Sequence, residues 1–171
     1  MNPVQLHLAL THFPVVLCIA GFSLMAYALI RKQALLVATA YWILVIAAVA
    51  ALPVYLTGEG TAESLEKLPG ISENIVESHE EVAETAFIAV ELVGILSVLG
   101  LIFQKRIRLG KALRLLTLLF AFVAAAALAD AAHLGGQIRH SEIRKEVRPA
   151  GGGVGNTEEG NTPRKGDEQG D

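Results

Sequence analysis

One short stretch near the end of the apolar part of the chain carries several side chains that could do chemistry. It reads ADAAHLGGQIRH, from Ala129 to His140, and it contains two imidazoles seven residues apart, His133 and His140. At about 100° per residue, seven positions leave two side chains roughly 20° apart on a helix, so both face the same neighbour. Imidazole is a common ligand of haem iron and of transition metals. The stretch therefore predicts a cofactor or metal near the end of a helix.

The other residues of this stretch allow more than one interpretation. Gly135 and Gly136 lie between the histidines. Glycine inside a helix costs up to about 1 kcal/mol, so the pair indicates the close approach of something bulky or flat, or a frayed helix end. Asp130 lies one turn before His133 and could orient its ring, or could form a hydrogen bond between helices. Arg139 could pair with a haem propionate, although a cation favoured by the helix dipole is the simpler interpretation.

The five histidines of the chain gather toward one side of the predicted membrane. His12 and His133 each lie 19 residues from a cation at the far end of their segments, which is roughly 28 Å along a helix. His79 and His140 each lie 26 residues from such a cation, roughly 39 Å. We therefore expect an inner pair, His12 with His133, and an outer pair, His79 with His140 or His7. His7 lies about 140° around the helix from His12, so these two cannot serve one site as neighbours.

Membrane-spanning helices must position these side chains. The 171 residues are 53% hydrophobic and 18% charged, with a mean hydropathy of +0.48, which is too apolar for an ordinary soluble protein. We predict an all-α fold, a four-transmembrane-helix bundle over residues 1–148, followed by a disordered polar tail at 149–171. Pro53 should kink or stop the second helix. Four segments have the roughly 20 apolar residues that a span needs: 4–30, 34–56, 82–103 and 109–134.

Basic residues set the expected orientation. Arg31 and Lys32 join the first two spans, and a run of cations at 104–114 joins the last two. Because short basic connections stay in the cytoplasm, both termini and the acidic loop from Thr57 to Ser78 should lie on the outer, periplasmic side of a bacterial inner membrane. Within that loop, TAESLEKL predicts a short surface helix, and a further helix should begin near Ser72 and run into the third span.

Two carboxylates of the third segment, Glu84 and Glu91, are also candidate site residues. Glu84 lies roughly 31 Å from Lys105 along a helix, at the depth of the inner histidines, but about 140° around the helix from His79. That angle weakens a metal centre built from both residues. Glu91 lies inside the bilayer, where an unpaired carboxylate is costly. It could be a proton site, a hydrogen-bonding partner of another helix, or a contact with another subunit.

Several classes of function lack support in the sequence. The net charge of −3 gives no reason to expect nucleic-acid binding. No G-x-S-x-G, H-E-x-x-H or phosphate-binding glycine motif points to a hydrolase. A single cysteine, Cys18, excludes a disulfide within the chain. The polar groups collect at one end and form no path across the bilayer, which argues against a transporter.

Four elements in order, THFPVVL, TGEGTAE, ESHEEVAETA and HLGGQIRH, resemble a bacterial family of four-helix membrane proteins called domain of unknown function 2231. The resemblance covers roughly residues 5–143. It implies a bundle similar to small b-type cytochromes, with His12, His79, His133 and the Gly135–Gly136 pair at positions that recur in the family. Haem binding is an implication of this resemblance.

The first functional hypothesis is a single haem b held by histidines of different helices near the outer face, with His12 and His133 as the preferred pair. Such a protein would carry one electron at a time between the lipid phase, from a quinol, and a periplasmic redox protein. The alternatives are a haem-free Cu, Zn or Fe site held by the same imidazoles, and a non-redox accessory subunit of a membrane complex. We expect an electron-transfer or accessory protein rather than a stand-alone enzyme. The candidate site residues are His12, His79, His133, His140, Gly135, Gly136 and Arg139, with Asp130, Glu91 and Glu84 as supporting or proton-carrying groups.

Overall fold

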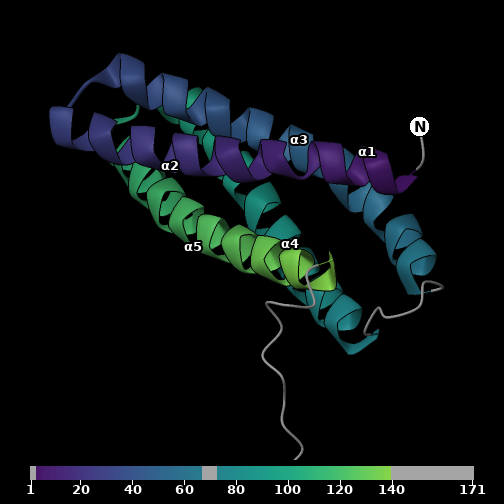
Figure 1. Ribbon diagram of the computed structural model, residues 1–171. Coiled ribbons are helices and arrows are strands. Elements are labelled where there is room, and N and C mark those ends of the chain that lie inside the picture. Colours follow the sequence, from purple (N-terminus) through teal and green to yellow (C-terminus); the bar gives the residue numbers. More distant parts are fainter. Residues whose placement is uncertain (1–2, 67–72, 140–171) are drawn as a thin grey trace, which may run out of the picture.

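The computed structural model describes residues 3–66 and 73–139, and every regular element in these two ranges is an α-helix. Only Thr11 separates the first two helices, and Figure 1 shows them as one continuous rod. The helices are α1 (Pro3–Leu10), α2 (His12–Arg31), α3 (Ala34–Glu66), α4 (Glu73–Phe103) and α5 (Ile107–Arg139).

Four helical segments are long and apolar enough to cross a membrane, which confirms the predicted bundle. Large apolar side chains on these helices face outward; Val16 is 62% exposed and Leu56 is 77% exposed. A soluble bundle would bury such side chains, whereas lipid accommodates them. The segments are Val4–Arg31, Ala34–Gly58, Glu73–Phe103 and Ile107–Ile138.

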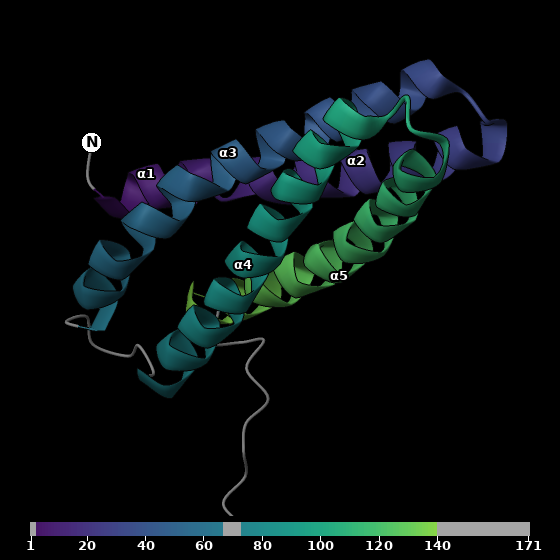
Figure 2. The same ribbon diagram turned by 180° about the vertical axis from the view of Figure 1, so that it is seen from behind.

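The second predicted span corresponds to a helix that continues well beyond Pro53. α3 runs on to Glu66, so residues 57–66 extend this helix and do not belong to the outer loop with a separate short helix that the sequence suggested. Proline lacks an N–H and crowds the carbonyl of the preceding turn, which bends a helix without necessarily ending it. The Thr57 hydroxyl lies 2.8 Å from the carbonyl oxygen of Pro53, to which it donates. Figure 2 shows α3 bending toward its C-terminal end.

The third and fourth spans are also longer than the predicted ranges. α4 is continuous from Glu73, nine residues before the expected span at 82, which agrees with a helix that begins early and runs into the membrane. α5 reaches Arg139, beyond the expected end at 134. These extensions are more polar than the membrane-spanning parts, so composition alone places them at the membrane surface and hydropathy does not detect them.

Small residues allow the helices to approach closely. A Cβ at Gly94 of α4 would stand only 2.5 Å from the Cβ of Ala48 on α3. Further along, a Cβ at Gly100 would run into the ring of Tyr41, which is fully buried. Without a hydrophobic driving force between helices in lipid, such close contacts supply much of the packing energy. The contacts fix α3 against α4 and so set which face of each helix points inward.

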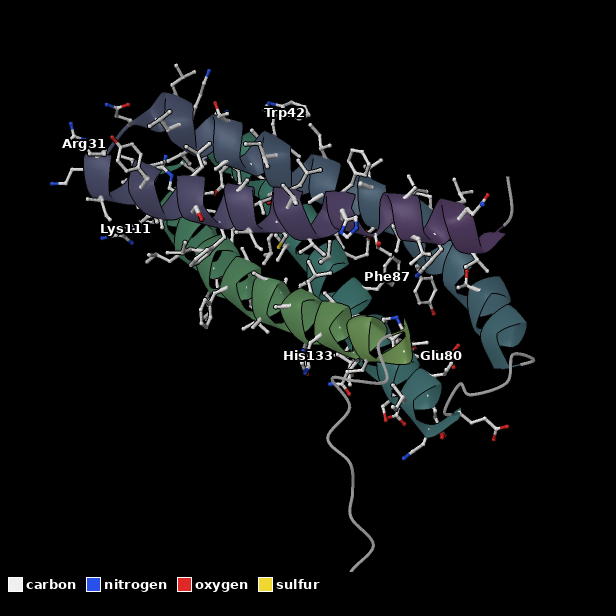
Figure 3. The ribbon with its side chains drawn as sticks, in the orientation of Figure 1. Arg31, Trp42, Glu80, Phe87, Lys111 and His133 are labelled. Atoms are coloured by element: carbon white, nitrogen blue, oxygen red, sulfur yellow. The ribbon has the colours of Figure 1, made fainter. Side chains whose placement is uncertain are left out.

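The bundle has two chemically different ends. The short connections α2–α3 and α4–α5 lie together at one of them, where Figure 3 labels Arg31 and Lys111. We call this the basic end. The other end contains α1, the later part of α3, the start of α4 and the end of α5, and Figure 3 labels Glu80 and His133 there. We call it the histidine end.

Candidate functional site

His7 of α1 points toward α3 at the histidine end. Its ring is half-buried, and Nδ1 lies 3.0 Å from the carbonyl oxygen of Val54 and 3.2 Å from the hydroxyl oxygen of Thr57. A carbonyl oxygen can only accept a hydrogen bond, so Nδ1 of the neutral ring carries the proton. The second nitrogen, Nε2, is then left unprotonated and has a lone pair available for a ligand bond.

His79 of α4 is held in the same way by a different helix. Its Nδ1 lies 3.0 Å from the carbonyl oxygen of Ala131 on α5, and the ring is half-buried. The same argument places the proton on Nδ1 and the lone pair on Nε2. Gly135, one turn after Ala131, faces this ring, because a Cβ there would stand 3.2 Å from Cε1 of His79. The absent side chain at Gly135 therefore makes room for the imidazole.

Both rings lie at the histidine end, His7 on α1 and His79 on α4. At this end α3 supplies the carbonyl oxygen that holds His7, and α5 supplies the one that holds His79. A ligand histidine of a metal or haem usually donates its other N–H to a carbonyl or carboxylate, which fixes its tautomer and its orientation. Both rings already have this arrangement. Chemically, the pair offers two oriented, neutral imidazole nitrogens.

The expected inner pair is not brought together inside the bundle. His12 and His133 are both exposed, on α2 and α5. His133 accepts a hydrogen bond at 2.8 Å from the side-chain amide of Gln137, one turn further along the same helix. Because α1 and α2 form one rod, and His7 lies about 140° around it from His12, an inward His7 turns His12 away from the site. His7 and His79, by contrast, are both half-buried and held by backbone carbonyls of neighbouring helices.

The remaining predicted site residues differ in their surroundings. Asp130 and Glu84 are exposed, and Gln137 rather than Asp130 is the residue placed on the ring of His133. Arg139 is the last residue of α5. His140 lies outside the described residues, so its expected pairing with His79 stays a prediction. Gly136, unlike Gly135, has open space where a side chain would be.

Glu91 lies in the middle of α4, at a groove of about 300 Å³ between α3 and α4. Its Oε1 is buried and finds no hydrogen-bond partner among the described residues. The groove is otherwise apolar, with Val49, Leu52 and Ile95 among its lining residues. Of the interpretations that the sequence left open, a hydrogen bond from a neighbouring helix is therefore not present within 3–66 and 73–139.

A stacked aromatic pair separates this groove from the histidines. The rings of Tyr55 and Phe87 are 4.2 Å apart between centroids and 11° from parallel. Tyr55 lies about one turn beyond Leu52 on α3, and Phe87 about one turn before Glu91 on α4. Figure 3 labels Phe87 between the two ends of the bundle. The order along the α3–α4 interface is therefore groove, aromatic pair, histidines.

A protein-only metal centre is not supported in the described part of the chain. Within residues 3–66 and 73–139, no group of three or more His, Cys, Asp or Glu side chains is placed to hold a metal ion. Structural and catalytic ions such as zinc need at least three protein ligands. A haem needs fewer, because its own ring nitrogens fill four positions on the iron and leave two axial positions for the protein.

Sequence reasoning gave His7 too little weight. His7 and His12 are about 140° apart around the helix, so they cannot both face one site. The spacing does not say which of the two faces it. The role of the carbonyl groups of Val54 and Ala131 could not be read from the sequence at all, because any residue type supplies a backbone carbonyl. Only the packing of α1 on α3 and of α4 on α5 identifies them.

The comparisons with known proteins agree with this architecture. No curated protein and no solved structure matches the chain. Residues 3–142 of the 171-residue sequence match a family described as a predicted membrane protein, DUF2231, so the match includes all five helices. The chain therefore belongs to the DUF2231 family of predicted membrane proteins.

Proposed function

We propose that this protein binds one haem b at the histidine end and that His7 and His79 are the residues that would hold it. The observation that carries the proposal is that each ring uses Nδ1 to hold a backbone carbonyl of a neighbouring helix and so presents Nε2 as a ligand. Two imidazoles from different helices are the donor set of a low-spin haem. The lack of a third ligand in the described residues suits haem better than a bare metal ion.

A haem at this position would supply one-electron redox chemistry, and the protein residues would hold and tune it. The carbonyl oxygens of Val54 and Ala131 orient the imidazoles and strengthen them as donors. Gly135 leaves the space that the ring of His79 occupies. Arg139, at the end of α5, is the proposed partner of a propionate at the wet edge.

The electron donor in this proposal is a quinol that enters from the lipid through the α3–α4 groove. The groove is lined by apolar side chains, and the carboxyl oxygen Oε1 of Glu91 in it has no hydrogen-bond partner among the described residues. A quinol hydroxyl is a donor on an otherwise apolar molecule, so it would satisfy this oxygen. The aromatic pair Tyr55–Phe87 lies between the groove and the histidines.

The proposed location is the bacterial inner membrane, with the basic end in the cytoplasm. Seven cations lie at that end, and short basic connections are retained on the cytoplasmic side. The histidine end then faces the periplasm, where a soluble redox protein could accept the electron. Such a protein would act as an electron carrier or accessory subunit rather than as a stand-alone enzyme.

The decisive test is a reduced-minus-oxidised visible spectrum of the protein purified in detergent. We expect the sharp bands of a low-spin haem, in a ratio of one haem to one chain. His7→Ala and His79→Ala should each remove these bands. The matched controls are His12→Ala and His133→Ala, which change the same residue type at exposed positions and should keep them.

Other outcomes of this experiment select between the alternatives. Loss of haem in the two control variants alone would show that the wrong pair has been chosen. No haem but one transition-metal ion per chain, measured by mass spectrometry, would favour the haem-free site, with ligands drawn in part from residues such as His140. Neither cofactor, even after haem is added to the purified protein, would leave the accessory role.

A further inference from the structure

The basic end contains a pocket that the proposed electron transfer does not use. It has a volume of about 300 Å³ and lies between α2, α3 and α5. Its walls are of two kinds. Ala28, Leu29, Val37 and Leu115 form an apolar part, whereas three cations, Lys32, Lys111 and Arg114, form a charged part.

The cations of this pocket have no carboxylate nearby along the chain. Before Glu59 the sequence contains no Asp or Glu, and none occurs between Glu91 and Asp130. The segments that build the basic end all come from these two acid-free stretches. No carboxylate of these two stretches is therefore available to pair with the cations of the pocket.

Arg114 is the most informative of the three cations. It lies on α5, two turns inside the end of that helix, and it is only partly exposed. Its Nε is buried and has no hydrogen-bond partner among the described residues. A buried donor without a partner costs free energy, about 1–3 kcal/mol in typical proteins. An anionic oxygen is the strongest acceptor for a guanidinium.

The pocket also receives the N-terminal end of a long helix. α3 begins at Ala34, which lines the pocket, so its first N–H groups and the positive end of its dipole lie there. Lys32 immediately precedes this helix and adopts a left-handed conformation with φ 52°, which turns the chain between α2 and α3. Cations, free N–H groups and an apolar wall together match a phosphate that carries acyl chains.

We propose that this pocket is a binding site for an anionic phospholipid of the phosphatidylglycerol class. The phosphate is held by Arg114, Lys111 and Lys32, and an acyl chain lies along the apolar wall toward the bilayer interior. Basic pockets between membrane helices are suited to such headgroups. The apolar wall distinguishes a lipid from free phosphate, which would gain nothing from it.

Native mass spectrometry of the full chain in a neutral detergent tests this proposal. We expect phosphatidylglycerol to bind with one tight site, at least tenfold tighter than phosphatidylcholine of the same chain length. Inorganic phosphate at equal concentration should not displace it. Equal affinity for the two lipids would overturn the proposal, and displacement by inorganic phosphate would mean that the pocket recognises a free anion.

Charge-matched variants separate a pocket from a merely basic surface. Arg114→Gln and Lys111→Gln should each weaken phosphatidylglycerol binding at least fivefold, and Arg114→Lys should restore part of the loss. Arg108→Gln removes the same charge from an exposed cation that does not line the pocket. The affinity of this variant for phosphatidylglycerol should stay within twofold of that of the unaltered chain. An equal loss in Arg108→Gln would overturn the proposal. If Arg114→Gln fails to fold, Lys111→Gln and the comparison of lipids on the unaltered chain still decide it.

Discussion

At the scale of single residues, the most informative feature is the hydrogen bond that each of two histidines makes to a backbone carbonyl. His7 on α1 donates from Nδ1 to a backbone carbonyl of α3, and His79 on α4 donates from Nδ1 to a backbone carbonyl of α5, at 3.0 Å in both cases. Each hydrogen bond satisfies a half-buried N–H and also fixes the tautomer of its ring. The repetition favours a shared task for the two Nε2 atoms, and it makes the neighbours of the two rings testable.

The two adjacent glycines of α5 should respond differently to substitution. Gly136→Ala should raise the free energy of unfolding by up to about 1 kcal/mol, because alanine favours a helix and the new Cβ meets nothing. Gly135→Ala should raise the free energy of unfolding by a smaller amount. Gly135→Leu should destabilise the protein and displace His79. Denaturation in detergent measures both effects, and the haem bands report the position of His79. Equal stabilisation by Gly135→Ala and Gly136→Ala would contradict the placement of His79 against Gly135.

Thr57 should contribute to holding His7. Thr57→Val keeps the shape of the side chain but removes the hydroxyl that contacts Nδ1 of His7. We expect a loss of about 1 kcal/mol in the free energy of unfolding, which is typical for one hydrogen bond. The control is Thr39→Val, since the exposed Thr39 hydroxyl bonds only the carbonyl of Leu35 in its own helix. Thr39→Val should change stability by less than half as much.

At the scale of elements, α3 and α4 define the middle of the protein. Gly94 against Ala48 and Gly100 against Tyr41 bring the two helices into close contact, and the groove at Glu91 lies alongside the first of these contacts. The closely packed Ala48 and Gly94 therefore form part of the groove wall. A carboxylate without a partner beside them, Glu91, suggests a function that outweighs its cost in stability.

Glu91→Leu should make the protein more stable and less able to use quinol. Stability should rise by about 1 kcal/mol, because a buried acceptor without a partner is removed. Haem reduction by a short-chain quinol should slow by about tenfold, which is what the loss of one hydrogen bond of about 1.4 kcal/mol produces. Stopped-flow spectroscopy measures the rate. Glu84→Gln, an exposed carboxylate two turns away on the same helix, is the control and should change neither quantity.

At the scale of the whole molecule, the separation of the two ends predicts how the protein sits in its membrane. Arg31 and Lys111 gather at one end, and Glu80 and His133 lie at the other (Figure 3). The lipid pocket proposed for the basic end and the haem proposed for the histidine end then face opposite sides of the bilayer. Electron transfer and lipid binding can therefore be tested independently of each other.

Cysteine labelling of intact cells should report this orientation. A membrane-impermeant maleimide should label Glu80→Cys and leave Lys105→Cys unlabelled until the membrane is opened with detergent. The native Cys18 is buried, so the unaltered chain should stay unlabelled and no cysteine-free background is needed. Labelling of Lys105→Cys alone in intact cells would reverse the orientation and place the histidine end in the cytoplasm.

The sequence by itself determined the architecture. Four apolar segments, two short basic connections and the grouping of five histidines toward one end follow from hydropathy, charge and a rise of 1.5 Å per residue. Spacing also showed that His7 and His12 cannot both face one site. These properties depend only on position along the chain, so no knowledge of helix contacts is needed to obtain them.

Only the tertiary structure decided which face of each helix is inside. In a soluble protein the apolar side of a helix identifies its inward face, but lipid is as apolar as a protein core, so both sides of a membrane helix look alike in sequence. Contacts such as Gly100 with Tyr41 set the rotation of each helix. That rotation turned His7 and His79 inward, left His12 and His133 exposed, and placed Arg114 in a pocket that spacing did not reveal.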